Sequence, residues 1–314
     1  MDPNLRLFAG TEGRPLAEKV AAELGCPLGQ SRTVVFGEGN LFVKIEENVR
    51  NASVFLIQGV SPPPNDNLVE LAFWIDAFKR ASAREVTAIV PFFSYGKGDK
   101  KDEPRVSIRA RVCADLLEAA GVDRLVTVDL HSAQIQGFFR VSVDVLYALP
   151  VFAEHIRREG TDNIVIVSND LGFSEQARKF ATVLGCGLAI CDKRRTNDAE
   201  QAEFVGLYGD VRRRDAIIVD DIIFTGGTLM ESCSALLRAG ARSVRACVTH
   251  GLFTKDARSR LEASDLQRIY VTDSVPRAEQ LAGGKVQVLT IAPLLAEAIR
   301  SIAEGRSISR LFPV

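Results

Sequence analysis

Short apolar runs alternate with stretches of helical period along most of the chain. In the first half, apolar, β-branched runs predict strands at 53–58, 86–92 and 124–129. Residues 68–81 carry apolar side chains at helical spacing, and Asn67 and Glu70 precede them in the positions of an N-cap and an N3 residue. A second amphipathic helix is predicted for 108–120, ending at Gly121. This alternation is typical of βα units that build a parallel sheet.

The same rhythm returns after about Tyr147. Apolar runs predict strands at 164–168, 187–191, 216–220 and 244–250, and residues 227–239 predict a helix. A last helix is expected to begin with Pro293 at its first position, and the tail 307–314 is expected to pack back on the first half. We therefore predict an α/β fold of two similar domains, residues 1–147 and 148–314, each with a central, mainly parallel sheet flanked by helices.

Composition narrows the class of protein. Of 314 residues, 46% are hydrophobic and 25% are charged, and the formal net charge of −1 does not favour a general nucleic-acid binder. No apolar stretch is long enough to cross a bilayer, and the N-terminus lacks the pattern of a signal peptide, so we expect no membrane association and a cytoplasmic location. The six cysteines show no C-x-x-C spacing, which favours free thiols.

The stretch IIVDDIIFTGGT at 217–228 carries the first candidate chemistry. Its apolar run is typical of a central strand of a parallel sheet, and such sheets bind ligands beyond the carboxyl ends of their strands. Asp220 and Asp221 are expected at that end. Adjacent carboxylates on an extended backbone point in different directions, so one of them can bind a ligand hydroxyl or a hydrated Mg²⁺.

A phosphate site is predicted directly downstream. Thr225, Gly226, Gly227 and Thr228 lie where a helix begins, and there the backbone N–H groups and the helix dipole attract a phosphate. A purely structural turn capped by Thr225 or Thr228 explains these four residues about as well when they are taken alone. Together with the acidic pair, they favour a phosphorylated sugar.

The pattern V-D-D-x-x-x-T-G-x-T resembles the phosphoribosyl diphosphate motif of the phosphoribosyltransferase fold. Further segments are similar to those of the ribose-phosphate diphosphokinase family: Asn67, Glu70 and Leu71 followed by DAFKRASA (76–83), DLHSAQIQGFF (129–139), CDKRR (191–195), APLLAEAI (292–299) and SISRLF (307–312). The resemblance extends from about Leu5 to Phe312. It implies two phosphoribosyltransferase-like domains, assembly of dimers into hexamers, and transfer of the diphosphoryl group of Mg-ATP to the anomeric hydroxyl of ribose 5-phosphate. The products would be phosphoribosyl diphosphate and AMP.

The resemblance also implies a role for individual residues. Asp220 and Asp221 would bind the ribose hydroxyls, and residues 225–228 would hold the 5-phosphate. His131 and Asp170 would bind Mg²⁺, and His131 would also position the ATP phosphates. A single His or Asp at a strand end is more often solvated or hydrogen-bonded than bound to a metal. Mg²⁺, however, usually takes few protein ligands beside phosphate and water oxygens, so two such residues are enough for a candidate site.

The resemblance also implies roles for two basic residues and for a group of ATP-binding residues. Lys193 and Arg195 match the mobile loop that the family closes over the transferred group, where fixed cations stabilise developing charge. A solvated basic turn is the structural alternative. Phe36 would stack on adenine across a subunit boundary, unless it is a core residue of an edge strand. The residues expected to contact ATP are Phe36, Glu38, Asn40, Lys97, Asp99, Lys100, Arg105 and His131.

Most positions at which this sequence differs from the family pattern are expected to lie near ATP. Glu38 and Asn40 stand where the family commonly has Asp and Glu, and Lys97-Gly98 replaces Arg-Gln. The loop after Arg195 is shorter than usual, and Leu-Gly-Phe at 171–173 and Phe224 also differ. These changes keep two alternatives open: a non-catalytic, synthetase-associated regulatory paralogue, and a diphosphokinase with altered nucleotide or sugar specificity. A salvage phosphoribosyltransferase is disfavoured by the two-domain length and by the segment 129–139.

Overall fold

The computed structural model describes residues 4–195, 202–254 and 256–312, except for the side chains at positions 194, 195, 202 and 203. The chain separates into two compact units. Unit 1 comprises the residues up to Tyr147 together with Ile291–Phe312, and unit 2 comprises Ala148–Thr290. The last helix therefore belongs to unit 1, although it follows unit 2 in the sequence.

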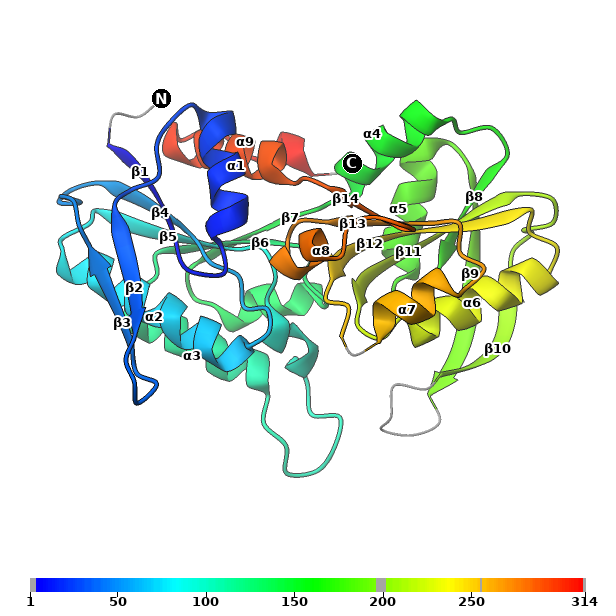
Figure 1. The fold of residues 1–314 in the computed structure, drawn as a ribbon, viewed down its shortest axis with the longest axis horizontal. Helices are drawn as coiled ribbons and strands as arrows, with labels where there is room; N and C mark the ends of the chain where they lie inside the picture. The colour runs from blue at the N-terminus through cyan, green and yellow to red at the C-terminus, as the bar shows by residue number, and fades with distance from the viewer. Residues whose placement is uncertain (1–3, 196–201, 255, 313–314) are drawn as a thin grey trace. The chain divides into compact units, whose positions relative to one another are not determined.

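Unit 1 is built on a parallel sheet of five strands in the order β1-β4-β5-β6-β7. The strands are β1 (Leu5–Ala9), β4 (Ser53–Ile57), β5 (Glu85–Val90), β6 (Arg124–Val128) and β7 (Ser142–Leu146). Figure 1 shows helices α1 (Arg14–Leu24) and α9 (Ala292–Ala303) on one face of this sheet, and α2 (Pro64–Arg80) and α3 (Arg109–Ala120) on the other. A separate hairpin pairs β2 (Ser31–Val35) with β3 (Leu41–Ile45).

The core of unit 1 lies between the sheet and α2. Trp74 and Phe78 on α2 stack with 5.7 Å between ring centroids, and both are buried with Val54 and Leu56 of β4. Each large apolar side chain stabilises the fold by about 2 to 3 kcal/mol when it leaves water. This buried face explains why the helical period around residues 68–81 could be recognised in the sequence.

Helix ends test the sequence predictions at single residues. Helix α3 ends at Gly121, whose φ of 102° suits glycine, as predicted. The predicted N-cap at Asn67 is wrong, because α2 already begins at Pro64 and Pro63 is its N-cap. Asn67 lies within the first turns, where its side-chain amide donates to the Ser61 carbonyl (2.8 Å). Helix α9 begins at Ala292, one residue before the predicted start at Pro293.

Unit 2 contains a sheet of seven strands in the order β10-β9-β8-β11-β12-β13-β14. Only β10 runs antiparallel to its neighbour among these described strands. The strands are β8 (Ile164–Ser168), β9 (Gly187–Arg195), β10 (Ala202–Tyr208), β11 (Asp215–Ile223), β12 (Ser243–Gly251), β13 (Arg268–Thr272) and β14 (Val286–Leu289). A mainly parallel sheet in each unit agrees with the prediction.

Helices cover both faces of the unit 2 sheet. Figure 1 shows α4 (Leu149–Glu159) and α5 (Ser174–Leu184) on one face, with α6 (Gly227–Arg238) and α7 (Ala257–Glu262) on the other. A short helix α8 (Pro276–Gln280) precedes β14. Leu229 and Leu236 of α6 pack with Leu261 of α7 in the core beneath the sheet. This layer fixes the position of α6, whose first residues were predicted to hold a phosphate.

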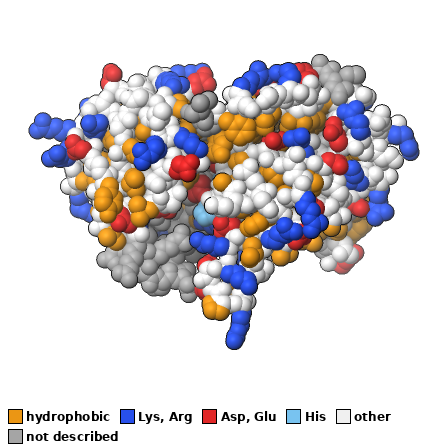
Figure 2. All heavy atoms as spheres, turned by 180° about the vertical axis from the view of Figure 1, so that it is seen from behind, with side chains coloured by type: hydrophobic (Ala, Val, Ile, Leu, Met, Phe, Trp, Pro, Cys, Tyr) orange, Lys and Arg blue, Asp and Glu red, His pale blue; other side chains and the backbone are white. Residues whose placement is uncertain are grey.

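The tail and the surface complete the fold. Three short 3₁₀ segments, η1 (Ser94–Gly98), η2 (Ala133–Phe138) and η3 (Ser309–Leu311), lie in unit 1, where the Phe312 ring approaches Tyr147 with 6.0 Å between centroids. Figure 2 shows positive and negative side chains interspersed on the face that it views. Within the described ranges, helices with the length and apolar character of a membrane span were not found.

Candidate active site

Asp220 and Asp221 lie inside β11 and not at its end, contrary to the sequence prediction. The strand continues to Ile223 because it stays paired with β12, whereas its pairing with β8 stops at Val219. The two aspartates therefore follow the point where one neighbouring strand has ended. At this position the strand is still paired with β12, but its edge toward β8 is no longer paired with that strand and is open to a ligand.

The two carboxylates face opposite sides of the sheet, because successive residues of a strand alternate. Asp220 is on the same face as Ile218, which packs in the core under α6, and it is half-buried. Asp221 is on the other face and is only 9% exposed. Burial raises the pKa of Asp220 well above its ordinary value, and the nearby charges of Asp221 and Asp170 raise it further. Asp220 is thus the more accessible of the two for a ligand hydroxyl.

The turn from β11 into α6 has the geometry of an anion site. Gly226 is the N-cap residue with φ of 74°, and an added β-carbon would lie 2.9 Å from a Leu261 methyl carbon. Within the described part of the chain, no side chain hydrogen-bonds as a cap to the first turn of α6. The Gly227 amide is 3.5 Å from the Thr225 hydroxyl, which is longer than an ordinary hydrogen bond. The first N–H groups of α6 therefore point toward a prospective anion.

Lys193 joins this turn from β9. Its ammonium donates to the Thr228 carbonyl (2.7 Å) and to the Asn169 side-chain oxygen (2.8 Å). Burial lowers the pKa of Lys193, and the electrostatic effects of Cys191, Asp220, Glu231 and Asp170 act in the opposite direction. The structure thus brings together Lys193 and the residues predicted to bind the sugar phosphate. Arg195 ends β9, and its side chain lies outside the described part of the chain, as do residues 196–201.

Asn169 is a site residue that sequence reasoning missed. It follows β8 directly, is 3% exposed, and donates its amide to Asp220 Oδ2 (2.6 Å). The only signal in the sequence was its position after a predicted strand, beside the predicted metal ligand Asp170. Asparagine has no strong preference for catalysis, and the polar partners of Asn169 come from distant parts of the chain.

Arg260 was also missed. It lies on α7, and its guanidinium is 3.7 Å from the place where a β-carbon on Gly227 would stand. A cation at this distance from the start of α6 can contact an anion bound there. No local sequence pattern indicates this contact, because it depends on how α7 packs against the turn through Leu261.

One of the two carboxylate oxygens of Asp170 is used in a local hydrogen bond. Its Oδ1 accepts from the Phe173 amide (2.9 Å), and its backbone carbonyl accepts from Ser168 (2.7 Å). No group of three or more His, Cys, Asp or Glu side chains suited to a metal ion occurs among the described residues. Mg²⁺ in nucleotide sites often takes only one or two carboxylates and draws its other ligands from phosphate and water. Asp170, beside the anion turn, fits such a limited role.

The residues predicted to bind ATP belong to unit 1. Phe36 follows β2 and is 47% exposed, which argues against a core position, and its ring is 6.1 Å from that of Phe42. Asn40 donates to Glu38 (3.3 Å) in the same hairpin turn. Lys97 lies on η1 and Asp99 is its C-cap, while exposed Lys100 and Arg105 follow. His131 is exposed and lies between β6 and η2.

Gly98 has a structural explanation. A β-carbon at this position would lie 2.6 Å from the Arg109 guanidinium nitrogen Nε and 2.8 Å from Arg109 Cβ. The side chain of Arg109, at the start of α3, therefore occupies the space that a larger residue at 98 would need. This departure from the family pattern is accommodated locally.

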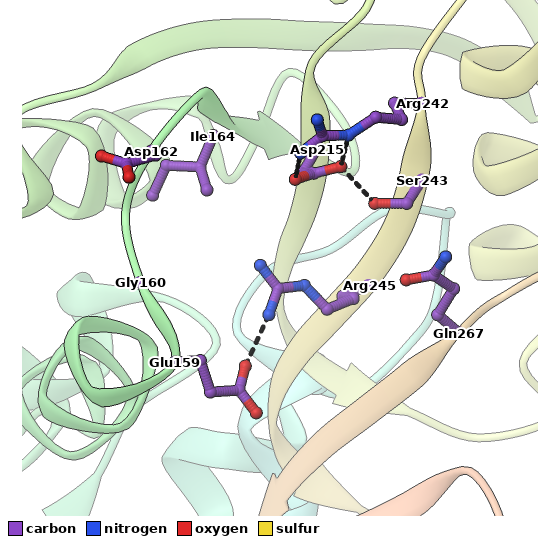
Figure 3. A pocket seen from close by; sticks show the side chains of 9 residues that line it. All are labelled: Glu159, Gly160, Asp162, Ile164, Asp215, Arg242, Ser243, Arg245 and Gln267. Atoms are coloured by element: carbon purple, nitrogen blue, oxygen red, sulfur yellow. Dashed lines mark hydrogen bonds and ion pairs between the residues drawn. The ribbon is translucent and has the colours of Figure 1, made fainter.

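A separate cavity of about 560 Å³ opens at the opposite, amino-terminal edge of the unit 2 sheet. It is lined by charged and polar residues at the starts of β8, β11 and β12 (Figure 3). Arg242 pairs with Asp215 (Nε to Oδ1, 2.8 Å), and Arg245 pairs with Glu159 (2.5 Å). Both arginines are thus already compensated by carboxylates, so this cavity is a weaker anion site than the turn at α6.

Comparison with known proteins agrees with this geometry. Residues 5–121 match the family model of the N-terminal domain of ribose phosphate pyrophosphokinase, and residues 196–313 match that of the phosphoribosyl synthetase-associated domain. A ribose-phosphate pyrophosphokinase of Maricaulis maris is 46% identical over 310 residues, which are 98% of this chain and 100% of the relative. One from Caldanaerobacter subterraneus subsp. tengcongensis is 44% identical over 310 residues, 98% of each chain.

The fold agrees as well. The crystal structure of phosphoribosylpyrophosphate synthetase from Mycobacterium smegmatis is 39% identical and matches with a TM-score of 0.89, over 96% of this chain and 99% of that chain. The predicted fold class, two phosphoribosyltransferase-like α/β domains, is thereby confirmed. The motifs, the arrangement of the anion turn and these likenesses lead to one conclusion: the chain belongs to the ribose-phosphate pyrophosphokinase family.

Proposed function

We propose that this protein is an active ribose-phosphate diphosphokinase. It transfers the diphosphoryl group of Mg-ATP to the anomeric hydroxyl of ribose 5-phosphate and forms phosphoribosyl diphosphate and AMP. The observation that carries the proposal is the cluster at the start of α6, where the Lys193 ammonium lies 2.7 Å from the Thr228 carbonyl beside an uncapped helix N-terminus. Two hydrogen bonds hold the half-buried Lys193 at this helix start, where its ammonium can contact a bound anion.

Ribose 5-phosphate would bind along β11 and the turn that follows. The amides of residues 226–228 would hold the 5-phosphate, as an uncapped helix start does for anions, with Arg260 adding a positive charge. Asp220 would accept a hydrogen bond from a ribose hydroxyl, and Asp221, on the opposite face, would support the strand more than the sugar.

In the reaction, the anomeric oxygen attacks the β-phosphorus of ATP. A new bond forms between that oxygen and phosphorus, and the bond from the β-phosphorus to the oxygen that bridges the α- and β-phosphates breaks. AMP leaves, and the hydroxyl proton passes to water. Lys193 would stabilise the charge that spreads over the transferred group, and Arg195 would assist from the end of β9. When bound, Mg²⁺ would neutralise the phosphates of ATP. Asp170 in unit 2 and His131 in unit 1 are each kept as a candidate ligand, as the family resemblance implies.

ATP would bind to the residues of unit 1. The exposed ring of Phe36 suits stacking on a base, Glu38 and Asn40 lie in the same turn, and Lys97 precedes the basic loop. Asp99, Lys100 and Arg105 would complete the phosphate contacts. We include self-association into dimers and hexamers and a cytoplasmic location in the proposal. Exposed apolar residues on α2 and α3, Val69, Phe73, Val112 and Leu116, support self-association.

The direct test is product formation. Purified protein incubated with Mg-ATP and ribose 5-phosphate should release AMP and phosphoribosyl diphosphate in equal amounts, and omission of Mg²⁺ should abolish the reaction. A folded protein that forms no AMP above background would refute the proposal. If activity appeared only after addition of a second synthetase subunit, the regulatory paralogue would be the better description.

A diphosphokinase of altered nucleotide specificity is the second candidate. The contact between Asn40 and Glu38 favours it, because this turn presents an amide donor where the family commonly has a second carboxylate. Competition with GTP and CTP decides between the two. ATP should prevail if the turn recognises adenine, and a preference for another nucleotide would establish the alternative.

A further inference from the structure

Asn169 is a buried polar residue to which the proposed function gives no role. Its side chain joins three elements at the candidate active site. The amide nitrogen donates to Asp220 Oδ2 on β11 (2.6 Å), and the amide oxygen accepts from Lys193 Nζ on β9 (2.8 Å) and from Ser232 Oγ on α6 (2.7 Å). Asn169 is 3% exposed and Ser232 is fully buried. A buried side-chain amide with three hydrogen bonds to different elements is strongly held in one position.

The orientation of this amide is fixed by the chemistry of its partners. An ammonium group can only donate hydrogen bonds, whereas a carboxyl group accepts them when ionised and can also donate one when protonated. A flipped amide would place its NH₂ group against the Lys193 ammonium, donor against donor, so the contact with Lys193 sets the orientation in either protonation state of Asp220. The Ser232 hydroxyl adds a second donor to the oxygen side. Asn169 therefore fixes the separation of Lys193 and Asp220 as well as their directions.

The amide also keeps two opposite charges from pairing directly. Lys193 uses two of its three donors, on Asn169 and on the Thr228 carbonyl, and among the described residues no hydrogen bond from its third donor is seen. Asp220 receives the Asn169 amide on Oδ2 and the Asp221 amide on Oδ1 (3.0 Å), and each oxygen has a further lone pair. A direct salt bridge would satisfy both groups and hold them away from the substrate.

We infer that Asn169 is a positioning residue, which holds the Lys193 ammonium at the start of α6 for the transferred group and the Asp220 carboxylate for the ribose hydroxyl, with Ser232 fixing its amide. The inference rests on the proposed function, because it assigns Lys193 to the reaction and Asp220 to the sugar. It predicts that the two contacts of Asn169 can be separated by substitution.

Two substitutions separate these contacts. Asn169→Asp retains an oxygen for Lys193 and Ser232 but places a carboxylate against Asp220, so the Kd for ribose 5-phosphate should rise about 10-fold or more while kcat falls only a few-fold. Asn169→Leu has a similar size and no polar atoms, so it should raise the Kd and also lower kcat by about 10- to 100-fold. Asn163→Asp, at the opposite end of β8, is the matched control and should leave both constants unchanged.

Kinetics with both substrates, calorimetric titration with ribose 5-phosphate alone, and thermal unfolding are measured on each variant. The inference is overturned if Asn169→Leu retains kcat and Kd within about two-fold, or if the Leu and Asp variants lose kcat equally. Should the Leu variant fail to fold, Ser232→Ala replaces it, with an expected loss of about 2- to 5-fold in kcat and no loss refuting the role of Ser232.

A crystal structure of Asn169→Leu separates this inference from the proposed function. Lys193 Nζ should leave its place 2.7 Å from the Thr228 carbonyl, whether or not the protein makes AMP. An unchanged lysine position would overturn the inference even in an active enzyme. Absence of AMP from the wild-type protein would instead refute the proposed function and leave the titration and the structure as valid tests of Asn169.

Discussion

Replacing Gly226 by alanine tests whether the anion turn depends on its backbone geometry. The residue has φ of 74°, and this left-handed conformation costs a residue with a β-carbon about 1 to 2 kcal/mol. The new β-carbon would also stand 2.9 Å from a Leu261 methyl carbon, which must shift by a few tenths of an ångström. We expect unfolding free energy to fall by about 2 kcal/mol, and the turn to relax toward a conformation in which its amides no longer converge.

Gly185→Ala is the matched control for this substitution. Gly185 lies in the same unit at the end of α5, has φ of 66°, and an added β-carbon would meet nothing within 4 Å. It therefore measures the cost of the left-handed conformation alone. Urea unfolding should show a loss of about 1 kcal/mol for Gly185→Ala and a larger loss for Gly226→Ala.

Calorimetric titration with ribose 5-phosphate then separates stability from binding. Gly226→Ala should weaken binding by at least about 10-fold, because several amide contacts to the phosphate are lost together. Gly185→Ala should bind as tightly as the wild-type protein. Equal affinities for the two variants, both folded at the temperature of the titration, would refute the assignment of this turn to the phosphate.

Three further predictions use other residues. Lys193→Ala should lower kcat about 100-fold with little change in the Kd for ribose 5-phosphate, whereas Asp220→Ala should mainly raise that Kd. If both variants changed kcat and Kd to the same extent, the assignment of Lys193 to the reaction and of Asp220 to the sugar would be contradicted. Arg260→Ala should raise the KM for ribose 5-phosphate about 3- to 10-fold, while Arg258→Ala on the same helix should leave this KM unchanged. The same KM for both variants would exclude a contact between Arg260 and the phosphate. Burial raises the pKa of Glu12 to about 7, so the unfolding free energy should decrease as pH rises from about 4.5 through 7, by on the order of 3 kcal/mol. Glu12→Gln should flatten this dependence in urea titrations, and an unchanged slope would show that another group is responsible.

Several strands that are buried on both faces could be predicted, although β1 and β13, which are also largely buried, were not. All residues of β4 and β8 are buried, so each strand appears in the sequence as a continuous apolar run. The hairpin strands β2 and β3 have mostly half-exposed and exposed residues, and their polar side chains gave no comparable signal. The edge strand β10 was missed for a similar reason, since Val205 on it is 60% exposed.

In the candidate site, too, residues could be predicted where the local sequence determines their role. The residues at the anion turn were predicted because helix starts and glycines have known backbone chemistry that local sequence reveals. Asn169, Ser232 and Arg260 act through contacts that bring together β8, α6 and α7, and no local pattern records such contacts. The extent of β11 beyond Asp220 was missed because it depends on pairing with β12, which is decided by the neighbouring strand.

A crystal structure with bound ribose 5-phosphate would show whether the turn into α6 holds the sugar phosphate. We expect the phosphate on the backbone amides of residues 226–228, with Asp220 within hydrogen-bond distance of a ribose hydroxyl and Lys193 beside the anomeric end. Sugar phosphate bound at another place in unit 2, such as the cavity at Arg242 and Arg245, with the turn at α6 empty, would contradict it.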